Sequence, residues 1–274
     1  MKTQSENPTP GINFALQSTL HMNSKDWIQY LEQNAGQQLK IPWGNEASLT
    51  LDEFRIVSGS IRIFQLGESS EGKHLLHQAA LYAKEVNDPH LEECVKLFIS
   101  EEQRHAEYLA RFMQIEKMPM ARKHWSDRAF RFLRRFWNLE ISMAVLLTAE
   151  LVARVYYRAL FSATESTLLK QICRQLLRDE VMHVYFHTGL LRQIQNRRSR
   201  FPCFLWNTAY RFFYSGTLIA VWIGHASVLK AGGFPFFHYW YSSHKHLNQA
   251  LSLLKSGAER IFVLEPKKYT LLPF

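Results

Sequence analysis

The sequence predicts an all-α fold built on four long antiparallel helices, and three observations support this prediction. Apolar residues recur at alternating three- and four-residue steps in four long segments between residues 50 and 196, which is the spacing of one face of a helix. Signals that stop and start helices separate these segments. No alternating apolar run with hairpin turns interrupts them, as strands would require. The hydrophobic share of 47% is that of a globular chain with a buried core.

Residues 1–49 form an N-terminal extension in front of this helical core. Residues 1–23 are mostly polar and are expected to form a disordered or draped tail. The stretch from Asp26 to Gln37 can form a short helix, and Pro42 then breaks the pattern.

The first two core helices meet at a clear boundary. The first is expected from Thr50 to Val86, because Thr50 and Glu53 have the spacing of a capping box. Asp88 and Pro89 then end this helix and start the next, since aspartate caps helices and proline suits a first helical position.

The remaining core helices are bounded by weaker signals. The second helix is expected to end near Lys117. The third is expected over residues 127–161, and the fourth from a turn in which Ser162 and Glu165 have capping spacing, as far as Asn196. Together these segments predict a helical core over residues 50–196.

Residues 197–274 are predicted to be a helical extension packed on this core, and their aromatic content is high. Phe212 to Leu229 is an 18-residue run without a formal charge, and Arg211 and Lys230 flank it. A membrane-spanning helix needs about 20 apolar residues. The stronger prediction is therefore an additional helix that packs on the core or at a dimer interface. A membrane-associated helix remains open, and either form could cover an apolar substrate channel.

The cysteine pattern and the N-terminus predict a cytoplasmic protein. Cys94, Cys173 and Cys203 form no closely spaced pair, which fits a reducing compartment and gives neither a zinc site nor a disulfide framework. Residues 1–20 contain no long apolar stretch behind a basic start, so no signal peptide is expected. Membrane association through residues 201–241 is the alternative location.

The net charge of +9 comes largely from clusters of basic residues. A solvated helix face is the simplest explanation. A docking surface for an acidic partner is the sharper one, and that partner could be an electron carrier, a carrier protein or an anionic membrane. Nucleic acid is not an expected partner, because no nucleic-acid-binding motif accompanies the clusters. The clusters are Arg128, Arg131, Arg134 and Arg135, then Arg192, Arg197, Arg198 and Arg200, then Lys267 and Lys268.

Carboxylates interrupt the apolar stripe near the middle of every core helix, and in the second and fourth helices a histidine follows three residues later. A buried carboxylate without a partner is costly, so a proton, a partner or a metal must neutralise it. Two divalent cations would explain all the interruptions at once. The predicted metal ligands are Glu68 or Glu71 in the first helix, Glu102 and His105 in the second, Glu150 in the third, and Glu180 and His183 in the fourth.

The order Glu, Glu-x-x-His, Glu, Glu-x-x-His resembles that of the ferritin-like di-iron carboxylate proteins, whose helix bundles use this ligand set. The resemblance covers about residues 50–196. It implies an antiparallel ferritin-like four-helix bundle and a pair of iron ions, with manganese or a mixed Mn/Fe pair as alternatives. It also implies oxidoreductase chemistry with O2, a small organic substrate and an external electron donor such as a ferredoxin. A homodimer is a further option.

Three functions within this resemblance compete. The first is an oxygenase or oxidase that hydroxylates, desaturates or N-oxygenates an organic and apolar substrate. The second is a rubrerythrin-like peroxidase, but such proteins normally carry a module with cysteine pairs and this chain has none. The third is ferritin-like iron storage, for which the large C-terminal segment is unexpected. A non-catalytic membrane-surface or interaction protein is the alternative outside the family.

The first-helix ligand stays ambiguous. Glu71 lies 31 residues before Glu102, which better matches the 30 residues between Glu150 and Glu180. Glu68 lies among glycines and serines whose small side chains leave room for a metal or a substrate. Glu68 is slightly preferred on this ground.

Several neighbours of the ligands could hold or orient them. Glu101 and Asp179 each precede a motif glutamate and could bind the histidine nitrogens that face away from a metal. Glu140 lies beside the stripe of the third helix, so a solvated or interfacial position is expected for it. The other candidate neighbours are His74, Tyr157 and His187.

Overall fold

The computed structural model describes residues 22–44, 46–69, 72–121, 138–197 and 200–256. Within these residues the regular structure is helical throughout and no strand is present, so the all-α prediction is confirmed for this part of the chain. The helices are α2 (Ser24–Gly36), α3 (Leu51–Glu68), α4 (Lys73–Val86), α5 (Leu91–Ile115), α7 (Leu139–Ser162), α8 (Thr167–Gln195), α9 (Arg200–Ala231) and α10 (Phe236–Ser256).

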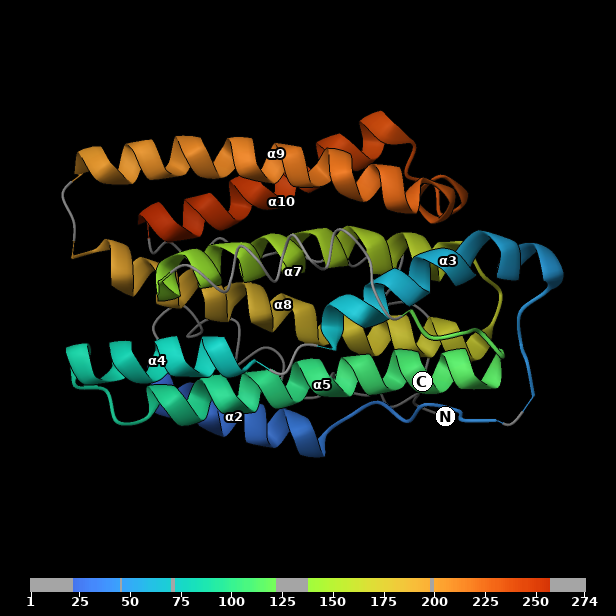
Figure 1. Ribbon diagram of the computed structural model, residues 1–274, viewed down its shortest axis with the longest axis horizontal. Helices are drawn as coiled ribbons and strands as arrows, with labels where there is room; N and C mark the ends of the chain where they lie inside the picture. Colours follow the sequence, from blue (N-terminus) through green and yellow to red (C-terminus); the bar gives the residue numbers. More distant parts are fainter. Residues whose placement is uncertain (1–21, 45, 70–71, 122–137, 198–199, 257–274) are drawn as a thin grey trace, which may run out of the picture.

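The helices lie side by side along the long axis of the molecule (Figure 1). Helices α3, α4, α5, α7 and α8 form the core: α7 packs along α8, and α5 contacts α3, α4 and α8. Helix α2 covers α5 on one side of this core. Helices α9 and α10 form an outer layer on the opposite side, where they contact α7 (Figure 1).

The apolar stripes predicted from the sequence face the interior. In α5, Val95, Phe98 and Leu109 are buried, and in α8 Ile172 and Leu176 are fully buried. The stripe residues Leu139, Met143, Leu146, Ala153 and Tyr157 of α7 are buried too. The expected start of that helix at residue 127 lies outside the described residues. The helical spacing of apolar residues therefore identified the core correctly.

The predicted first helix is two helices. Helix α3 ends at Glu68, and α4 begins at Lys73 after Gly72, whose φ of +64° is one that glycine adopts without strain. A Cβ atom on Gly72 would also lie 2.5 Å from Cδ1 of Ile99. The expected continuous helix was wrong because its apolar stripe continues across the break, which falls next to Glu68.

Three helix-start signals were tested with different results. The Asp88–Pro89 start is wrong by two residues, because α5 begins at Leu91 with His90 as its N-cap. The Thr50–Glu53 capping box is present at the start of α3. The Ser162–Glu165 prediction is wrong: Ser162 ends α7, and the cap of α8 is Ser166, whose hydroxyl accepts a hydrogen bond from the amide of Leu169 at 3.2 Å. Residue spacing could not separate two serines four positions apart.

The C-terminal segment contributes two helices where the sequence predicted one. The segment Cys203–Ala231 within α9 has a mean hydropathy of 1.4 and is long and apolar enough to span a membrane by length and composition. Hydrogen bonds typical of a Schellman motif end α9, and Gly233 adopts a φ of +83° there. The chain then turns back, and α10 packs beside α9.

Candidate metal centre

Three helices bring five acid and histidine side chains together at the middle of the core. Helix α5 contributes Glu102 and His105, α7 contributes Glu150, and α8 contributes Glu180 and His183. All but Glu102 are buried, and the side chain of Glu102 retains 15% of its exposed surface. The five motif residues therefore lie at the same level along the axis of the helical core, as their positions in the helices predicted.

The two histidines direct their Nδ1 atoms into this cluster. His183 Nδ1 lies 3.0 Å from Glu102 Oε1, 3.6 Å from Glu180 Oε2 and 3.7 Å from Glu150 Oε2. His105 Nδ1 lies 3.7 Å from both Glu102 Oε1 and Glu180 Oε1. Glu102 and Glu180 thus lie between the two imidazoles.

Two overlapping groups in this cluster could hold metal ions. One consists of Glu102, His105 and His183, and the other of Glu150, Glu180 and His183. Within each group, one potential ligand atom per residue lies within 4.8 Å of the others. Oxygen and imidazole nitrogen donors of this kind suit iron or manganese, and no thiolate belongs to either group.

The Nε2 atoms of the two histidines, which face away from the cluster, are each bound by a carboxylate of the other helix, and we call this arrangement crosswise. His105 on α5 contacts Asp179 on α8 through Nε2, with 3.1 Å to Oδ2. His183 on α8 contacts Glu101 on α5 through Nε2, with 3.2 Å to Oε2. Because a carboxylate accepts the hydrogen bond, each Nε2 carries a proton, and in the neutral ring each Nδ1 then has its lone pair toward the cluster.

Helix α2 supplies a residue that the sequence did not single out. The side-chain amide of Asn34 donates hydrogen bonds to Glu101 and, at 2.9 Å, to Asp179 Oδ1. The side-chain oxygen of Asn34, Oδ1, accepts a hydrogen bond from Arg178. Asn34 therefore joins the two carboxylates that hold the two histidines. A lone asparagine on a short helix looks like a surface residue, so only its position against α5 and α8 reveals this contact.

The buried atoms at the centre of the cluster lack hydrogen bonds. Among the described residues these atoms are Glu102 Oε1, His105 Nδ1, both carboxylate oxygens of Glu180, and His183 Nδ1. His183 Nδ1 and Glu102 Oε1 are close, but their orientation is not that of a hydrogen bond. Buried polar atoms without partners are costly. Metal ions placed between them would satisfy all five atoms, so the residues fit a metal pair.

The electrostatics of the cluster also favour a cation. Burial raises the pKa of Glu180 well above its usual value, and the charge of Glu150 raises it further. Burial, then the charges of Glu102 and Glu150, raise the pKa of Glu68 in the same way. Burial alone would raise the pKa of Glu150 too, but contacts with Glu180 and His183 hold it well below its usual value. The carboxylates therefore cannot all be ionised cheaply without a positive charge between them.

Glu68 reaches this cluster from the end of α3. Its Oε1 accepts a hydrogen bond of 2.8 Å from the hydroxyl of the buried Tyr157. His187, one turn beyond His183, lies with Nε2 3.2 Å from Glu150 Oε1. Tyr157 and His187 therefore each contact one of the predicted carboxylate ligands.

Two other candidates stay predictions. Glu71, the alternative first-helix ligand, lies outside the described residues. His74 lies in the first turn of α4, beyond the break from Glu68.

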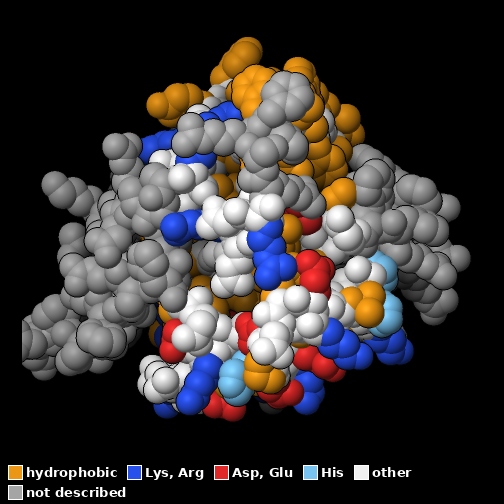
Figure 2. Space-filling view, turned by 90° about the vertical axis from the view of Figure 1, so that its left-hand side faces the viewer, with side chains coloured by type: hydrophobic (Ala, Val, Ile, Leu, Met, Phe, Trp, Pro, Cys, Tyr) orange, Lys and Arg blue, Asp and Glu red, His pale blue; other side chains and the backbone are white. Residues whose placement is uncertain are grey.

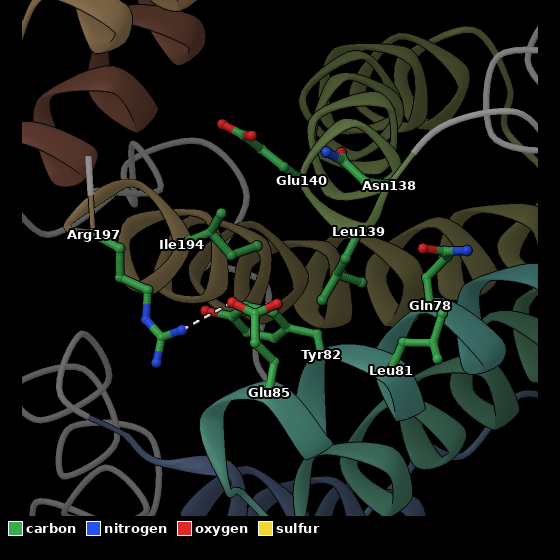
Figure 3. Close-up of a pocket in the computed structure, with 9 residues that line it drawn as sticks. All are labelled: Gln78, Leu81, Tyr82, Glu85, Asn138, Leu139, Glu140, Ile194 and Arg197. Carbon is green, nitrogen blue, oxygen red and sulfur yellow. Dashed lines mark hydrogen bonds and ion pairs between the residues drawn. The ribbon is translucent and has the colours of Figure 1, made fainter. Parts of the chain in front are cut away.

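Of the two positions expected for Glu140, solvated or interfacial, the solvated one is wrong, because this side chain is buried. It lies ten residues before Glu150 on α7, about 15 Å along the helix. There it lines a pocket of about 340 Å³ that also contains Tyr82 of α4 and an ion pair of 3.1 Å between Glu85 and Arg197 (Figure 3). Glu140 thus belongs to the end of the helical core.

Comparisons with protein-family models, with curated proteins and with solved structures find no match for this chain.

Replacing Asn34 with leucine is expected to weaken metal binding about 10- to 100-fold, because residues that orient histidine ligands have effects of this size. The substitution leaves Glu101 and Asp179 without their shared donor. Competition with a coloured chelator would measure the affinity. Gln33→Leu changes the exposed neighbour on the same helix and should leave the affinity unchanged. Equal affinities for all three proteins would show that Asn34 has no part in the site.

Proposed function

We propose that this chain is a ferritin-like four-helix-bundle oxidoreductase that binds two iron ions and uses O2 to oxidise a small, apolar organic substrate. One observation carries the proposal: two histidine Nδ1 atoms and three buried or nearly buried carboxylates converge at one depth of the helical core, and separate carboxylates hold the outer nitrogen of each histidine. The crosswise arrangement fixes the lone pairs of both imidazoles toward the same space. A bundle whose acids merely paired with histidines would not need this second set of carboxylates.

The distances suggest a division of roles among the ligands. Glu102 and Glu180 each have a carboxylate oxygen within 3.7 Å of both His105 Nδ1 and His183 Nδ1, so these two carboxylates would help to hold both ions. Glu150 Oε2 lies 3.7 Å from His183 Nδ1 and would help to hold the ion on that side. Glu68, whose Oε1 accepts a hydrogen bond from Tyr157, would supply a further carboxylate.

When bound, a pair of iron ions would supply the electrons and the coordination positions for O2 reduction. The protein would control access to that chemistry. Glu68 and Glu102 keep some exposure, while Glu150 and Glu180 are buried. We therefore place the entrance for O2 and substrate on the side of Glu68 and Glu102, next to the break between α3 and α4. The hydroxyl of Tyr157 would orient Glu68 on this side.

The first test is the metal content of protein purified without chelators, followed by anaerobic loading with ferrous iron. We expect close to two irons per chain and an absorbance change on exposure to O2. A protein that retains no metal and does not respond to ferrous iron and O2 would contradict the proposal. It would then favour the non-catalytic alternative.

A second arm of the same experiment separates the enzyme classes. Hydrogen peroxide replaces O2 as the oxidant of the ferrous protein. Faster oxidation by peroxide than by O2 would favour a rubrerythrin-like peroxidase. Iron uptake far beyond two ions per chain would favour storage.

A further inference from the structure

Helix α9 exposes a continuous apolar face. Leu205, Phe212 and Ile219 are spaced seven residues apart and Ile223 follows after four, so all four lie on one side of the helix. Their side chains are exposed, and Phe212 keeps 77% of its surface. Figure 2 shows hydrophobic side chains gathered at the top of the molecule, where α9 and α10 lie in Figure 1. Charged side chains of both signs lie in the lower half of this view, among uncharged ones.

Helix α10 extends this face with aromatic side chains. Phe237 and Tyr241 are exposed and lie four residues apart on one side of α10. The ring of Phe237 packs 5.5 Å from that of Phe236, which in turn packs 5.3 Å from Trp222 of α9. The two helices thus present one apolar surface. We call it the α9–α10 face and define it by Leu205, Phe212, Ile219, Ile223, Phe237 and Tyr241.

The charged residues of α9 and α10 are all basic. Residues 181–258 contain eight lysines and arginines and no aspartate or glutamate. Lys230 and Lys245 are exposed on α9 and α10. Lys230 lies seven residues beyond Ile223, on the same side of α9, with its Nζ 5.7 Å from the centre of the Trp222 ring. Lys245 lies four residues beyond Tyr241, on the same side of α10.

We propose that the α9–α10 face docks on an anionic lipid membrane, with α9 lying in the plane of the bilayer surface. An apolar helix face with basic residues beside it is the pattern of a helix bound at such an interface. A symmetric dimer through this face would instead bring two positively charged layers together. The proposal does not depend on the metal centre.

The opposite side of α9 packs on the helical core, so this helix cannot cross the bilayer while the core is folded. Tyr214 and Leu218 are fully buried on this side of α9. His225 is buried there too, and its Nδ1 lies 2.7 Å from Ser60 Oγ of α3. A side packed on the core and exposed apolar residues on the other side place α9 at a surface.

Vesicle flotation of the full chain tests the proposal. The two probes are vesicles of phosphatidylcholine alone and vesicles in which phosphatidylglycerol replaces part of the phosphatidylcholine. We expect strong binding to the anionic vesicles, weaker binding to the neutral ones, and loss of the difference at high salt. Equal binding to both, or binding to neither, would overturn the proposal.

Two double variants separate the apolar and the electrostatic contributions. Phe212→Ser with Ile223→Ser should weaken binding about 100-fold, because two apolar side chains no longer enter the lipid. Leu51→Ser, at a leucine of 78% exposure on α3, is the matched control and should bind like the unaltered chain. Lys230→Gln with Lys245→Gln should weaken binding to anionic vesicles roughly 30-fold and leave neutral vesicles unaffected.

Further outcomes would overturn the proposal. If either double variant binds anionic vesicles like the unaltered chain, the α9–α10 face is not the docking surface. The chain could fail to bind vesicles and have a mass in solution that corresponds to two copies. If Phe212→Ser with Ile223→Ser then reduces that mass to one copy, a second chain covers the α9–α10 face. Circular dichroism of each variant verifies that the helices are intact before binding is compared.

Discussion

Replacing Glu180 with alanine is expected to reduce the metal bound per chain from two ions to one or none. Glu180 is fully buried, its oxygens lie 3.7 Å from His105 Nδ1 and 3.6 Å from His183 Nδ1, and neither oxygen has a hydrogen bond. Its carboxylate would therefore serve both ions. Elemental analysis after loading with ferrous iron measures the change.

Glu107→Ala is the matched control for this prediction. Glu107 lies on α5 two residues beyond His105, but its side chain is exposed. Metal content should be unchanged in this variant. If Glu180→Ala retained two ions per chain, the proposed ligand set would be wrong.

The metal-free form of Glu180→Ala should be at least as stable as the metal-free unaltered chain. Burial, then the charge of Glu150, raise the pKa of Glu180, so this carboxyl is in an unfavourable place when no cation is present. Urea denaturation in the presence of a chelator would compare the two proteins. A metal loss accompanied by a collapse of stability would instead indicate a structural role for Glu180.

Replacing Gly232 with alanine is expected to destabilise the protein by about 3 kcal/mol or more, because overpacking against backbone atoms cannot be relieved by a change of rotamer. Gly232 follows α9 directly and is buried against α7. A Cβ atom there would lie 2.1 Å from the carbonyl oxygen of Ala159 and 2.5 Å from its Cα. The α9–α10 pair would have to move away from α7. Urea denaturation of the metal-free protein measures the loss.

Two neighbouring glycines provide controls for this substitution. Gly224→Ala adds a methyl group within α9 where no atom lies within 4 Å, and helix propensity predicts a gain of up to about 1 kcal/mol. Gly233→Ala also meets no atom, but its φ of +83° costs an alanine roughly 1 kcal/mol. Similar stabilities for all three variants would show that the backbone of α7 can yield at Ala159.

The helical core could be predicted from the sequence because the spacing of apolar residues within a single helix is enough to identify its buried side. A residue every three or four positions fixes which side of a helix is buried, and Val57, Phe98 and Leu176 are buried accordingly. The same periodicity placed Glu102 and Glu180 on the sides of their helices that face the core. The break between α3 and α4 was missed because the apolar stripe continues on both sides of it, and periodicity alone does not reveal where one helix ends and the next begins.

The contacts between helices could not be predicted in detail. Sequence spacing suggested that Glu101 and Asp179 could hold histidines, but it does not say which carboxylate meets which ring. The structure pairs each with the histidine of the other helix. Asn34 was missed for the same reason, since its partners lie 67 and 145 residues away in the chain.

The crosswise hydrogen bonds to the two histidines have a consequence for the order of folding and metal binding. While α5 and α8 are apart in a newly made chain, neither His105 nor His183 has the carboxylate that fixes its proton on Nε2. Either ring could then turn or carry its single proton on Nδ1 instead of Nε2, and it would be a poor ligand. High-affinity metal uptake would therefore follow the docking of α5 on α8. A stalled or truncated chain that lacks α8 would not bind the metal tightly, and metal retention would report that the core had assembled.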